Sequence, residues 1–458
     1  MQAVSKSIFK AYDIRGIVNE DLTIETVVLI GKAIGSESID RGERGIVVGR
    51  DGRTSGPDLM NALVEGIKST GCHVVKIGMI PTPVLYYATY SKGASSGVMI
   101  TGSHNPPNYN GFKMMIAGET LSGERILNLY ERINNQNFHQ GQGTSTTIDI
   151  QEDYLNRVTS DISIKRPLKI VVDCGNGVAG HLAPKLFEAL GCEVVKLFCH
   201  IDGNFPNHHP DPSKLENLND LIAEIKAEKA DLGLAFDGDG DRLGVIDEKG
   251  NVIWADRQMI LFSRDVIHRN PGAKIVFDVK CSSLLSKDIS NQGGRPILSR
   301  TGHSFIKAKI KEESALLGGE MSGHIFFKER WYGFDDALYA GARLLEILSS
   351  RNESCSEIFS ELPDSFNTPE INIHFDKQGD QFEAMEKLKK TANFNEGVLT
   401  TIDGIRLDYE DCWGLVRPSN TTPCLVLRFE AETEVSLKRI REEFREWLER
   451  TGIDSKAI

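Results

Sequence analysis

A repeated alternation of short apolar strands and helices constrains this chain more than any other feature of its sequence. The segment GCHVVKIG at residues 71–78 closely matches GCEVVKLF at residues 191–198, and β-branched runs recur at 45–50, 169–174 and 274–279. Each run is short and apolar enough for a buried strand of a mostly parallel sheet. Helix-period segments that end in Gly follow, which is the alternation typical of α/β domains. The sequence therefore predicts three related α/β units.

Each predicted unit also carries one polar, Gly-containing loop directly after an apolar run. The three stretches are GVMITGSHNP, LGLAFDGDGDR and ALLGGEMSGH, at residues 97–106, 232–242 and 315–324. Ligands of α/β sheets bind beyond the carboxyl ends of the strands. We therefore expect these loops to carry the chemistry of the protein.

Changes of pattern along the 458 residues indicate four domains. Polar or charged stretches near 144–150, 247–256 and 352–370 predict domains at 1–149, 150–252, 253–365 and 366–458. Length alone corresponds to about three domains. The last domain differs from the others, because a polar loop at 417–423 lies between apparent strands and a charged amphipathic helix follows it.

Composition excludes several classes of protein. The formal net charge of −12 argues against a general nucleic-acid binder, although an acidic protein can still hold an anionic substrate in a locally basic site. No window approaches the roughly 18 apolar residues of a membrane span, and the first residues lack the apolar core of a secretory signal. Eight scattered cysteines without a CxxC pair fit reduced thiols. We expect a cytoplasmic monomer without a nucleic-acid or membrane partner.

The first loop, TGSHNPP at 101–107, places Ser103 between Gly102 and His104 just after an apolar strand. This position is suited to presenting a hydroxyl, although a serine becomes a good nucleophile only when a base or its electrostatic surroundings activate it. An ordinary turn is the alternative, because Gly, Ser, Asn and Pro are also the residues that turns use.

The second loop spaces Asp237, Asp239 and Asp241 two residues apart, with glycines between them. Three such carboxylates would repel each other, so a hard divalent cation, Mg²⁺, is the natural ion to bind them and neutralise their charge. A calcium-binding EF-hand is disfavoured, because Arg242 stands where that loop needs Gly and strand-like runs flank the segment. A solvated acidic turn is the other alternative. The shell looks incomplete, and a phosphorylated serine could supply the missing ligand.

The third and fourth loops offer groups that bind sugars and phosphates. Glu320, Ser322 and His324 alternate, so in an extended segment they would project to one side and suit sugar hydroxyls. A half-exposed strand edge is the alternative. In RPSNTTP (417–423), an arginine fork is followed by hydroxyls and turn amides that suit a phosphate dianion, unless the loop is an ordinary polar turn.

Several isolated residues could bring positive charge or a proton carrier to the serine: Tyr12, Arg15, Lys113, Lys280 and His303. Taken one at a time, such residues are more often solvated or structural. The stretch FFKERWYGFDD at 326–336 is interpreted as packing followed by a loop.

Taken together, TGSHNP, DGDGDR, GEMSGH and RPSNTTP, in this order, resemble the α-D-phosphohexomutase superfamily, and most closely its bacterial phosphomannomutase/phosphoglucomutase members. The resemblance implies three related α/β domains with mixed sheets and a smaller, different C-terminal α+β domain, arranged around a central cleft. It also implies an intramolecular phosphotransferase that interconverts hexose 1-phosphates and 6-phosphates of mannose and glucose. The reaction would use a phosphoserine enzyme and a hexose 1,6-bisphosphate that reorients in the cleft.

The resemblance also assigns roles to individual residues. Ser103 would carry the phosphoryl group, and Mg²⁺ would bind Asp237, Asp239, Asp241 and the phosphorylated Ser103. Glucose or mannose 1,6-bisphosphate would act as activator and intermediate. The sugar-binding set would be Glu320, Ser322, His324, Arg242, Lys280 and Tyr12. The distal phosphate would bind Arg417, Ser419, Asn420 and Thr421, and the hydroxyl proton would pass through Lys113, helped by Arg15 or His303.

Two other functions compete with a mutase. A phosphatase with a phosphoserine intermediate would release inorganic phosphate, and a non-catalytic protein that binds sugar phosphates or cations would leave Ser103 unlabelled. Neither explains why a serine, a metal loop, a sugar loop and a phosphate loop are spread over the whole chain.

Overall fold

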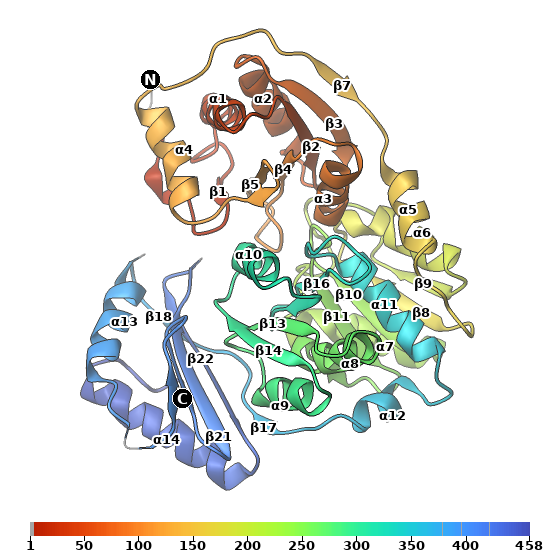
Figure 1. Ribbon diagram of the computed structural model, residues 1–458, viewed down its shortest axis with the longest axis vertical. Helices are drawn as coiled ribbons and strands as arrows, with labels where there is room; N and C mark the ends of the chain where they lie inside the picture. Colours follow the sequence, from red (N-terminus) through yellow and green to blue (C-terminus); the bar gives the residue numbers. More distant parts are fainter. Residues whose placement is uncertain (1–3, 378, 395, 421) are drawn as a thin grey trace.

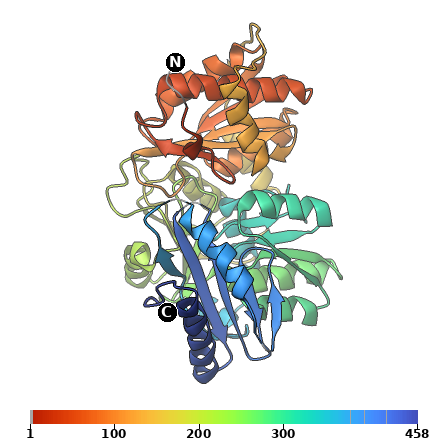
Figure 2. The same ribbon diagram turned by 90° about the vertical axis from the view of Figure 1, so that its left-hand side faces the viewer.

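Four domains, each built on its own sheet, make up the computed structural model, which describes residues 4–377, 379–394, 396–420 and 422–458 (Figures 1 and 2). Domain 1 lies at the top of Figure 1 in red and orange, and domain 4 lies at the lower left in blue. Three mixed α/β sheets and a distinct C-terminal sheet confirm the predicted fold class.

Domain 1 has a sheet in the strand order β1-β5-β4-β2-β3-β7, with β6 paired to β5. Its strands are β1 (Ile14–Ile17), β2 (Gly45–Arg50), β3 (His73–Met79), β4 (Ser96–Ile100), β5 (Tyr109–Ile116), β6 (Glu119–Thr120) and β7 (Ser145–Thr147). Its helices are η1 (Lys6–Ile8), α1 (Ile24–Asp40), α2 (Gly56–Lys68), α3 (Thr82–Ser91) and α4 (Glu124–Asn134).

Domain 2 has the strand order β12-β11-β10-β8-β9, and domain 3 has the order β14-β13-β15-β16. The elements of domain 2 are α5 (Gln151–Thr159), β8 (Lys169–Asp173), η2 (Val178–His181), α6 (Ala183–Ala189), β9 (Glu193–Leu197), η3 (Leu215–Leu218), α7 (Asn219–Glu228), β10 (Leu232–Phe236), β11 (Leu243–Asp247) and β12 (Val252–Ile253). Those of domain 3 are α8 (Ala255–Arg269), β13 (Lys274–Asp278), α9 (Ser283–Asn291), β14 (Arg295–Ser299), α10 (His303–Glu313), β15 (Leu317–Gly319), β16 (Ile325–Phe327), α11 (Ala337–Ser349) and α12 (Cys355–Ser360).

Domain 4 pairs all its strands antiparallel, in the order β17-β22-β21-β20-β19 with β18 also on β22. Its elements are β17 (Phe366–Asn367), β18 (Ile371–His374), α13 (Asp380–Thr391), β19 (Val398–Thr400), β20 (Ile405–Asp408), β21 (Cys412–Pro418), β22 (Cys424–Ala431) and α14 (Glu434–Arg450). Among the described residues, no helix has both the length and the apolar character needed to cross a membrane.

The first three sheets share one strand plan. In each, three parallel strands are followed by one antiparallel strand: β3-β2-β4-β5, β9-β8-β10-β11 and β14-β13-β15-β16. The predicted strands at 45–50, 169–174 and 274–279 are β2, β8 and β13, and their interior positions are buried as their apolar runs require. The three polar loops of the sequence therefore occupy the same position, between the third parallel strand and its antiparallel neighbour.

The cores of the domains are not equally connected. One continuous apolar cluster includes residues of domains 1, 2 and 3, such as Tyr87, Phe187 and Trp331. Domain 4 has a separate core around β21, β22 and α14. It meets domain 3 through a small apolar cluster of Val279, Trp413 and Leu415.

Candidate active site

The serine loop between β4 and β5 holds Ser103 in a constrained backbone. Ser103 has φ of +49°, in the left-handed region, and its side chain is almost wholly buried. Such a conformation is costly for a residue other than glycine, so its surroundings must hold it. The Thr101 hydroxyl accepts a hydrogen bond from Ser103 N at 2.8 Å.

A buried arginine that the sequence interpretation missed supports this loop. Arg53 Nη2 donates to Ser103 O at 2.9 Å and to Asn105 O at 2.6 Å, and Arg53 Nη1 donates to Pro106 O at 2.6 Å. Asp51 pairs with Arg53 Nε at 3.2 Å. Both residues follow β2, so their place beyond the end of a parallel strand was the signal available in the sequence.

The serine and the aspartate loop lie together, as the sequence analysis predicted. Ser103 Oγ donates to Asp237 Oδ2 at 3.1 Å, and it also lies 3.2 Å from His104 Nδ1. A Cβ at Gly238 would lie 2.3 Å from Ser103 O, so only glycine lets the two loops pack this closely. Burial and nearby cations, Arg242 first among them, hold the pKa of His104 well below its usual value, which makes the ring neutral beside the serine.

The three aspartates form a buried acidic group. Asp237, Asp239 and Asp241 have no exposed surface and present oxygens within 4.8 Å of one another, in an arrangement that could hold a metal ion. Strands β10 and β11 flank the loop, so the EF-hand alternative is wrong. The burial of all three carboxylates shows that the solvated turn is wrong as well. Among the described residues, Asp239 Oδ1 and Asp241 Oδ1 have no hydrogen-bond partner. Buried carboxylate oxygens without donors are the groups that a hard cation would ligate, so this donor set fits Mg²⁺.

Lys113 reaches the acidic group from β5 of domain 1. Its ammonium lies 2.7 Å from Asp239 Oδ2 and also pairs with Asp241. Burial alone would lower the pKa of Lys113, but the charges of Asp239 and Asp241 outweigh it and raise that pKa. Lys113 is therefore a fixed positive charge in this site.

The loop of domain 3 that was predicted to bind sugar is a turn, which corrects one expectation. Glu320, Ser322 and His324 were expected on one side of an extended segment, but Glu320 N donates to His324 O at 2.9 Å and Gly323 has φ of +97°. Glu320 accepts a hydrogen bond from Gly302 N, and His324 lies beside Asp241 and Arg242. Ser322 lies in the turn itself and is half-buried. Gly323 allows the positive φ that closes this turn.

Two further residues, which the sequence analysis did not single out, lie beside His303 and His324. Asp335 is fully buried and lies 3.3 Å from His324 Nδ1 and 3.6 Å from His303 Nδ1. Lys307 on α10 pairs with Asp335 Oδ1 at 2.8 Å. Burial and the charge of Lys307 hold the pKa of His303 well below its usual range. Asp335 lies in the stretch that was interpreted as packing, so its role in holding two histidines was not visible there.

The loop of domain 4 that was predicted to bind phosphate approaches domains 1 and 3. Arg417 is buried, and both Arg417 and Asn420 lie close enough to the Tyr12 side chain of domain 1 to act against the rise in its pKa that burial causes. Ser419 Oγ lies 2.9 Å from Thr422 Oγ1, and Thr422 N donates to Ser419 Oγ at 3.2 Å. Thr421, the last residue predicted for this loop, lies outside the described residues. Tyr12 also packs edge-on against His303, so residues of three domains meet here.

The remaining predicted residues lie near the site but already have partners. Arg15 donates to Asn105 Oδ1 at 2.7 Å and pairs with Asp13. Lys280 pairs with Glu370 at 2.6 Å, at the connection between domains 3 and 4. Arg242 Nε donates to His324 Nε2 at 3.1 Å and so links domains 2 and 3.

Comparison with protein families gives four matches in order along the chain. They are the alpha/beta/alpha domains I, II and III of phosphoglucomutase/phosphomannomutase at residues 6–140, 152–250 and 254–366, and the C-terminal domain of the same family at 370–446.

Individual relatives match over nearly the whole length of the chain. A phosphomannomutase/phosphoglucomutase of Pseudomonas aeruginosa is 57% identical, covering 98% of this chain and 96% of the relative. A phosphoglucomutase of Neisseria meningitidis is 52% identical, with 98% of each chain covered. The crystal structure of a phosphoglucomutase/phosphomannomutase family protein from Burkholderia thailandensis superposes with a TM-score of 0.94 at 49% identity, covering 98% of this chain and 99% of that one.

Proposed function

The chain belongs to the phosphoglucomutase/phosphomannomutase family, and from this premise we propose that it interconverts the 1-phosphates and 6-phosphates of glucose and mannose. The observation that carries the proposal is the contact of Ser103 Oγ with Asp237 Oδ2 at 3.1 Å. It puts a hydroxyl that can carry a phosphoryl group against an acidic group that can hold a cation. Relatives named for glucose and for mannose phosphates support both substrates.

In this proposal, phosphorylated Ser103 donates its phosphoryl group to the free hydroxyl of a bound hexose phosphate. The resulting hexose 1,6-bisphosphate reorients, and its other phosphate returns to Ser103. Charge spreads over the transferring oxygens in such a reaction, so positioning and fixed positive charge do most of the work. Lys113 and Arg15 supply that charge from domain 1.

Mg²⁺ is the cation we propose for the acidic group, held by Asp237, Asp239, Asp241 and an oxygen of phosphorylated Ser103. When bound, it polarises the phosphoryl oxygens and neutralises part of their charge. The two carboxylate oxygens that lack a hydrogen-bond partner in the part of the chain that the structure describes support this assignment.

His303 is the group we propose to accept the proton of the attacking sugar hydroxyl. Burial and the charge of Lys307 lower the pKa of His303, so the ring is neutral and one of its nitrogens carries no proton before the transfer. Asp335 and Lys307 fix the position of the ring. This changes the expectation from the sequence, which assigned the proton transfer to Lys113: the charges of Asp239 and Asp241 raise the pKa of Lys113, so in this proposal it keeps its proton and stays a source of charge.

The other residues would bind the two ends of the substrate. Glu320, Ser322, His324, Arg242, Lys280 and Tyr12 would contact the sugar, and Arg417, Ser419, Asn420 and Thr421 would hold the phosphate that is not reacting. Because the sugar turns around between the two transfers, this set must accept either end. We further propose that one chain, working as a monomer in the cytoplasm, is sufficient, since all of these groups come from the same chain.

The test is a substrate comparison with purified protein. Mannose 1-phosphate, glucose 1-phosphate and glucosamine 1-phosphate are given separately with Mg²⁺ and a trace of glucose 1,6-bisphosphate, and kcat/KM is measured for each. We expect 6-phosphate products from the first two at much higher kcat/KM than from the third. Mass spectrometry should detect a fraction heavier by about 80 Da, from one phosphate on Ser103. Stoichiometric release of inorganic phosphate would indicate a phosphatase, and no turnover with unlabelled Ser103 would indicate a binding protein.

A further inference from the structure

Asp403, which none of the motifs contains, lies at a junction between two domains. It occupies the turn between β19 and β20 of domain 4 and is 8% exposed. A single oxygen, Asp403 Oδ2, accepts hydrogen bonds from Arg417 Nε at 2.9 Å and from the backbone N–H of Thr301 at 3.0 Å. Arg417 belongs to domain 4 and Thr301 to domain 3, so one carboxylate oxygen holds both.

The backbone next to Asp403 is shaped to make this contact. Gly404 has φ of +83°, and a Cβ there would lie 2.2 Å from Val416 O and 2.6 Å from Arg417 Cα. Only glycine allows the turn to press against β21 at this point. The turn therefore delivers the Asp403 carboxylate to the side of the guanidinium.

Thr301 leads directly to the sugar-binding loop of domain 3. Its hydroxyl donates to Asp278 Oδ2 at 2.9 Å, and the next residue, Gly302, donates its N–H to Glu320. Asp278 Oδ1 in turn accepts the N–H of Met321 at 3.3 Å. A short chain of hydrogen bonds thus runs from Arg417 through Asp403 to the turn that carries Glu320.

The edge of the Arg417 guanidinium that Asp403 does not contact indicates the purpose of the contact. Asp403 binds Arg417 at Nε, whereas Nη2 is buried and has no hydrogen-bond partner among the described residues. A buried guanidinium nitrogen without an acceptor is costly, and a phosphate oxygen would satisfy it. Asp403 therefore holds one edge of Arg417 and leaves Nη2 for an anion.

We propose that Asp403 is a positioning residue that fixes the Arg417 guanidinium relative to domain 3, and so sets the separation between the phosphate-binding arginine and the sugar-binding loop. The inference rests on the proposed function, because it needs Arg417 to bind the phosphate that is not reacting. It predicts that Asp403 acts on substrate binding entirely through Arg417.

The first experiment compares Asp403→Ala with wild type in the mutase assay. We expect KM for glucose 1-phosphate to rise about tenfold while kcat changes less than about threefold, since the serine and the aspartate loop are untouched. Asp403→Asn should raise KM less, because one amide oxygen can still accept both hydrogen bonds. The matched control is Asp411→Ala, which removes another domain 4 carboxylate, paired with Arg439 at a more exposed position. It should leave KM unchanged.

A double variant separates positioning from general loss of structure. If Asp403 acts through Arg417, then Asp403→Ala combined with Arg417→Ala has the same KM as Arg417→Ala alone, whereas independent effects would multiply. Multiplying effects, or a lowered KM in Asp403→Ala, would overturn the inference. An unchanged KM in Asp403→Ala also overturns the inference about Asp403. If Arg417→Ala nevertheless raises KM, the proposed function is not affected by that result. An unchanged KM in Arg417→Ala would reject the phosphate-binding role itself. Should Asp403→Ala fail to fold, Asp403→Ser removes the same carboxylate and takes its place.

Discussion

The interface between domains 1 and 3 and the interface between domains 3 and 4 are built from different chemistry. The first is aromatic and tightly packed. Trp331 of domain 3, only 5% exposed, stacks on Tyr339 at 4.2 Å and on Tyr87 of domain 1 at 6.1 Å. Arg157 of α5 lies over the Trp331 ring at 4.8 Å. This packing belongs to the apolar cluster that runs through domains 1, 2 and 3.

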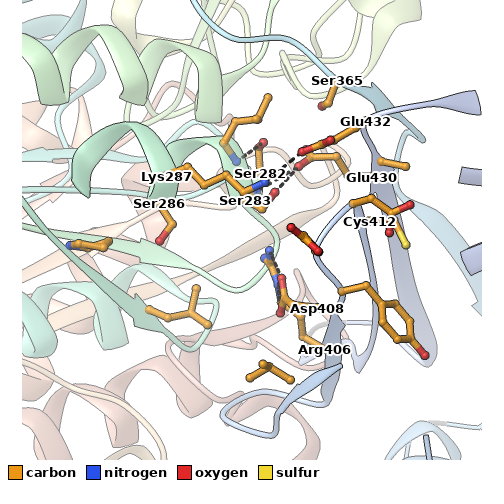
Figure 3. A pocket seen from close by; sticks show the side chains of 18 of the residues that line it. Ser282, Ser283, Ser286, Lys287, Ser365, Arg406, Asp408, Cys412, Glu430 and Glu432 are labelled. Atoms are coloured by element: carbon orange, nitrogen blue, oxygen red, sulfur yellow. Dashed lines mark hydrogen bonds and ion pairs between the residues drawn. The ribbon is translucent and has the colours of Figure 1, made fainter. Parts of the chain in front are cut away.

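The second interface is mostly polar. Arg406 Nη1 donates to Val279 O and Cys281 O, both at 2.8 Å, and Glu430 accepts from Ser283 N at 3.1 Å. A pocket of about 660 Å³ opens between these groups. Figure 3 shows Arg406 paired with Asp408 on one side of the pocket and Glu430 facing Ser283 on the other.

The proposed site has two tasks, phosphoryl transfer at Ser103 and binding of the phosphate that is not reacting. The difference between the interfaces matches these two tasks. The contact of Ser103 with Asp237 depends on domains 1 and 2, which share the continuous core, and close packing resists displacement. The residues proposed to bind phosphate belong to domain 4, whose hydrogen bonds to domain 3 can be exchanged for bonds to water at small net cost. We therefore expect domain 4 to rotate when phosphosugars enter and leave, so that the contact of Asp403 with Thr301 holds Arg417 in place only while the domains are closed, and the serine and the aspartates stay in place throughout.

The largest expected effect is on the chemistry of Ser103, which lies in the part of the molecule where domains 1, 2 and 3 share one closely packed core. Ser103→Ala should lower kcat by at least about 10³-fold, because the phosphoryl carrier is gone, while binding of sugar phosphate measured by calorimetry persists. The mass increase from phosphorylation should also disappear. Ser145→Ala, on the edge strand β7 of the same domain, serves as the control. Near-normal turnover of Ser103→Ala would reject the carrier role and the division of tasks between the interfaces.

The next effect is on stability at the aromatic interface. Trp331→Ala should cost about 3–5 kcal/mol, because it removes a buried ring and leaves a cavity between domains. The melting temperature measured by calorimetry should fall accordingly. Tyr90→Ala removes a ring that stacks on Tyr332 at the edge of this interface and is 46% exposed, so the loss of stability should be much smaller. Equal losses in the two variants would show that the interface is not closely packed.

A smaller effect is expected at the polar interface. Arg406→Ala leaves two carbonyls at Val279 and Cys281 without their donor, at a cost of about 1–3 kcal/mol. We expect KM for glucose 1-phosphate to rise several-fold with kcat nearly unchanged, because only the placement of domain 4 is affected. A loss of kcat with unchanged KM would contradict the assignment of binding to this interface. Arg439→Ala, on the surface of domain 4, is the control.

The smallest effect concerns pH and the aromatic interface. Burial raises the pKa of Asp336, which accepts hydrogen bonds from Tyr154 and Trp331, to about 7. In the unfolded chain this pKa is about 3.9. A raised pKa in the folded state stabilises the fold below about pH 4, and this contribution is lost as the pH rises to about 7. The melting temperature of wild type minus that of Asp336→Asn should therefore fall over this range. A difference that stays constant or rises would show that the pKa of Asp336 is not raised.

The sequence predicted the repeated sheets well because their signal is local. Buried strands such as β2, β8 and β13 correspond to continuous apolar runs in the sequence, and each polar loop follows its strand directly. The contact of Ser103 with Asp237 was also predictable, since the acidic triplet needed a further ligand. The residues missed act through contacts distant in sequence: Arg53 binds carbonyls of the serine loop, Asp335 holds two histidines, and Asp403 joins two domains. The turn at Gly323 was missed because alternation of polar residues suggests extension, whereas the backbone there has positive φ.

The shared strand plan of the first three domains also bears on how freely their loops can differ. Each of the three loops lies at the same position on a separate sheet. A substitution in one loop therefore leaves the strand pairing of the other two sheets untouched. One loop can hold the serine, another the three aspartates and the third the glutamate and histidine, without any one sheet having to accommodate all of these groups.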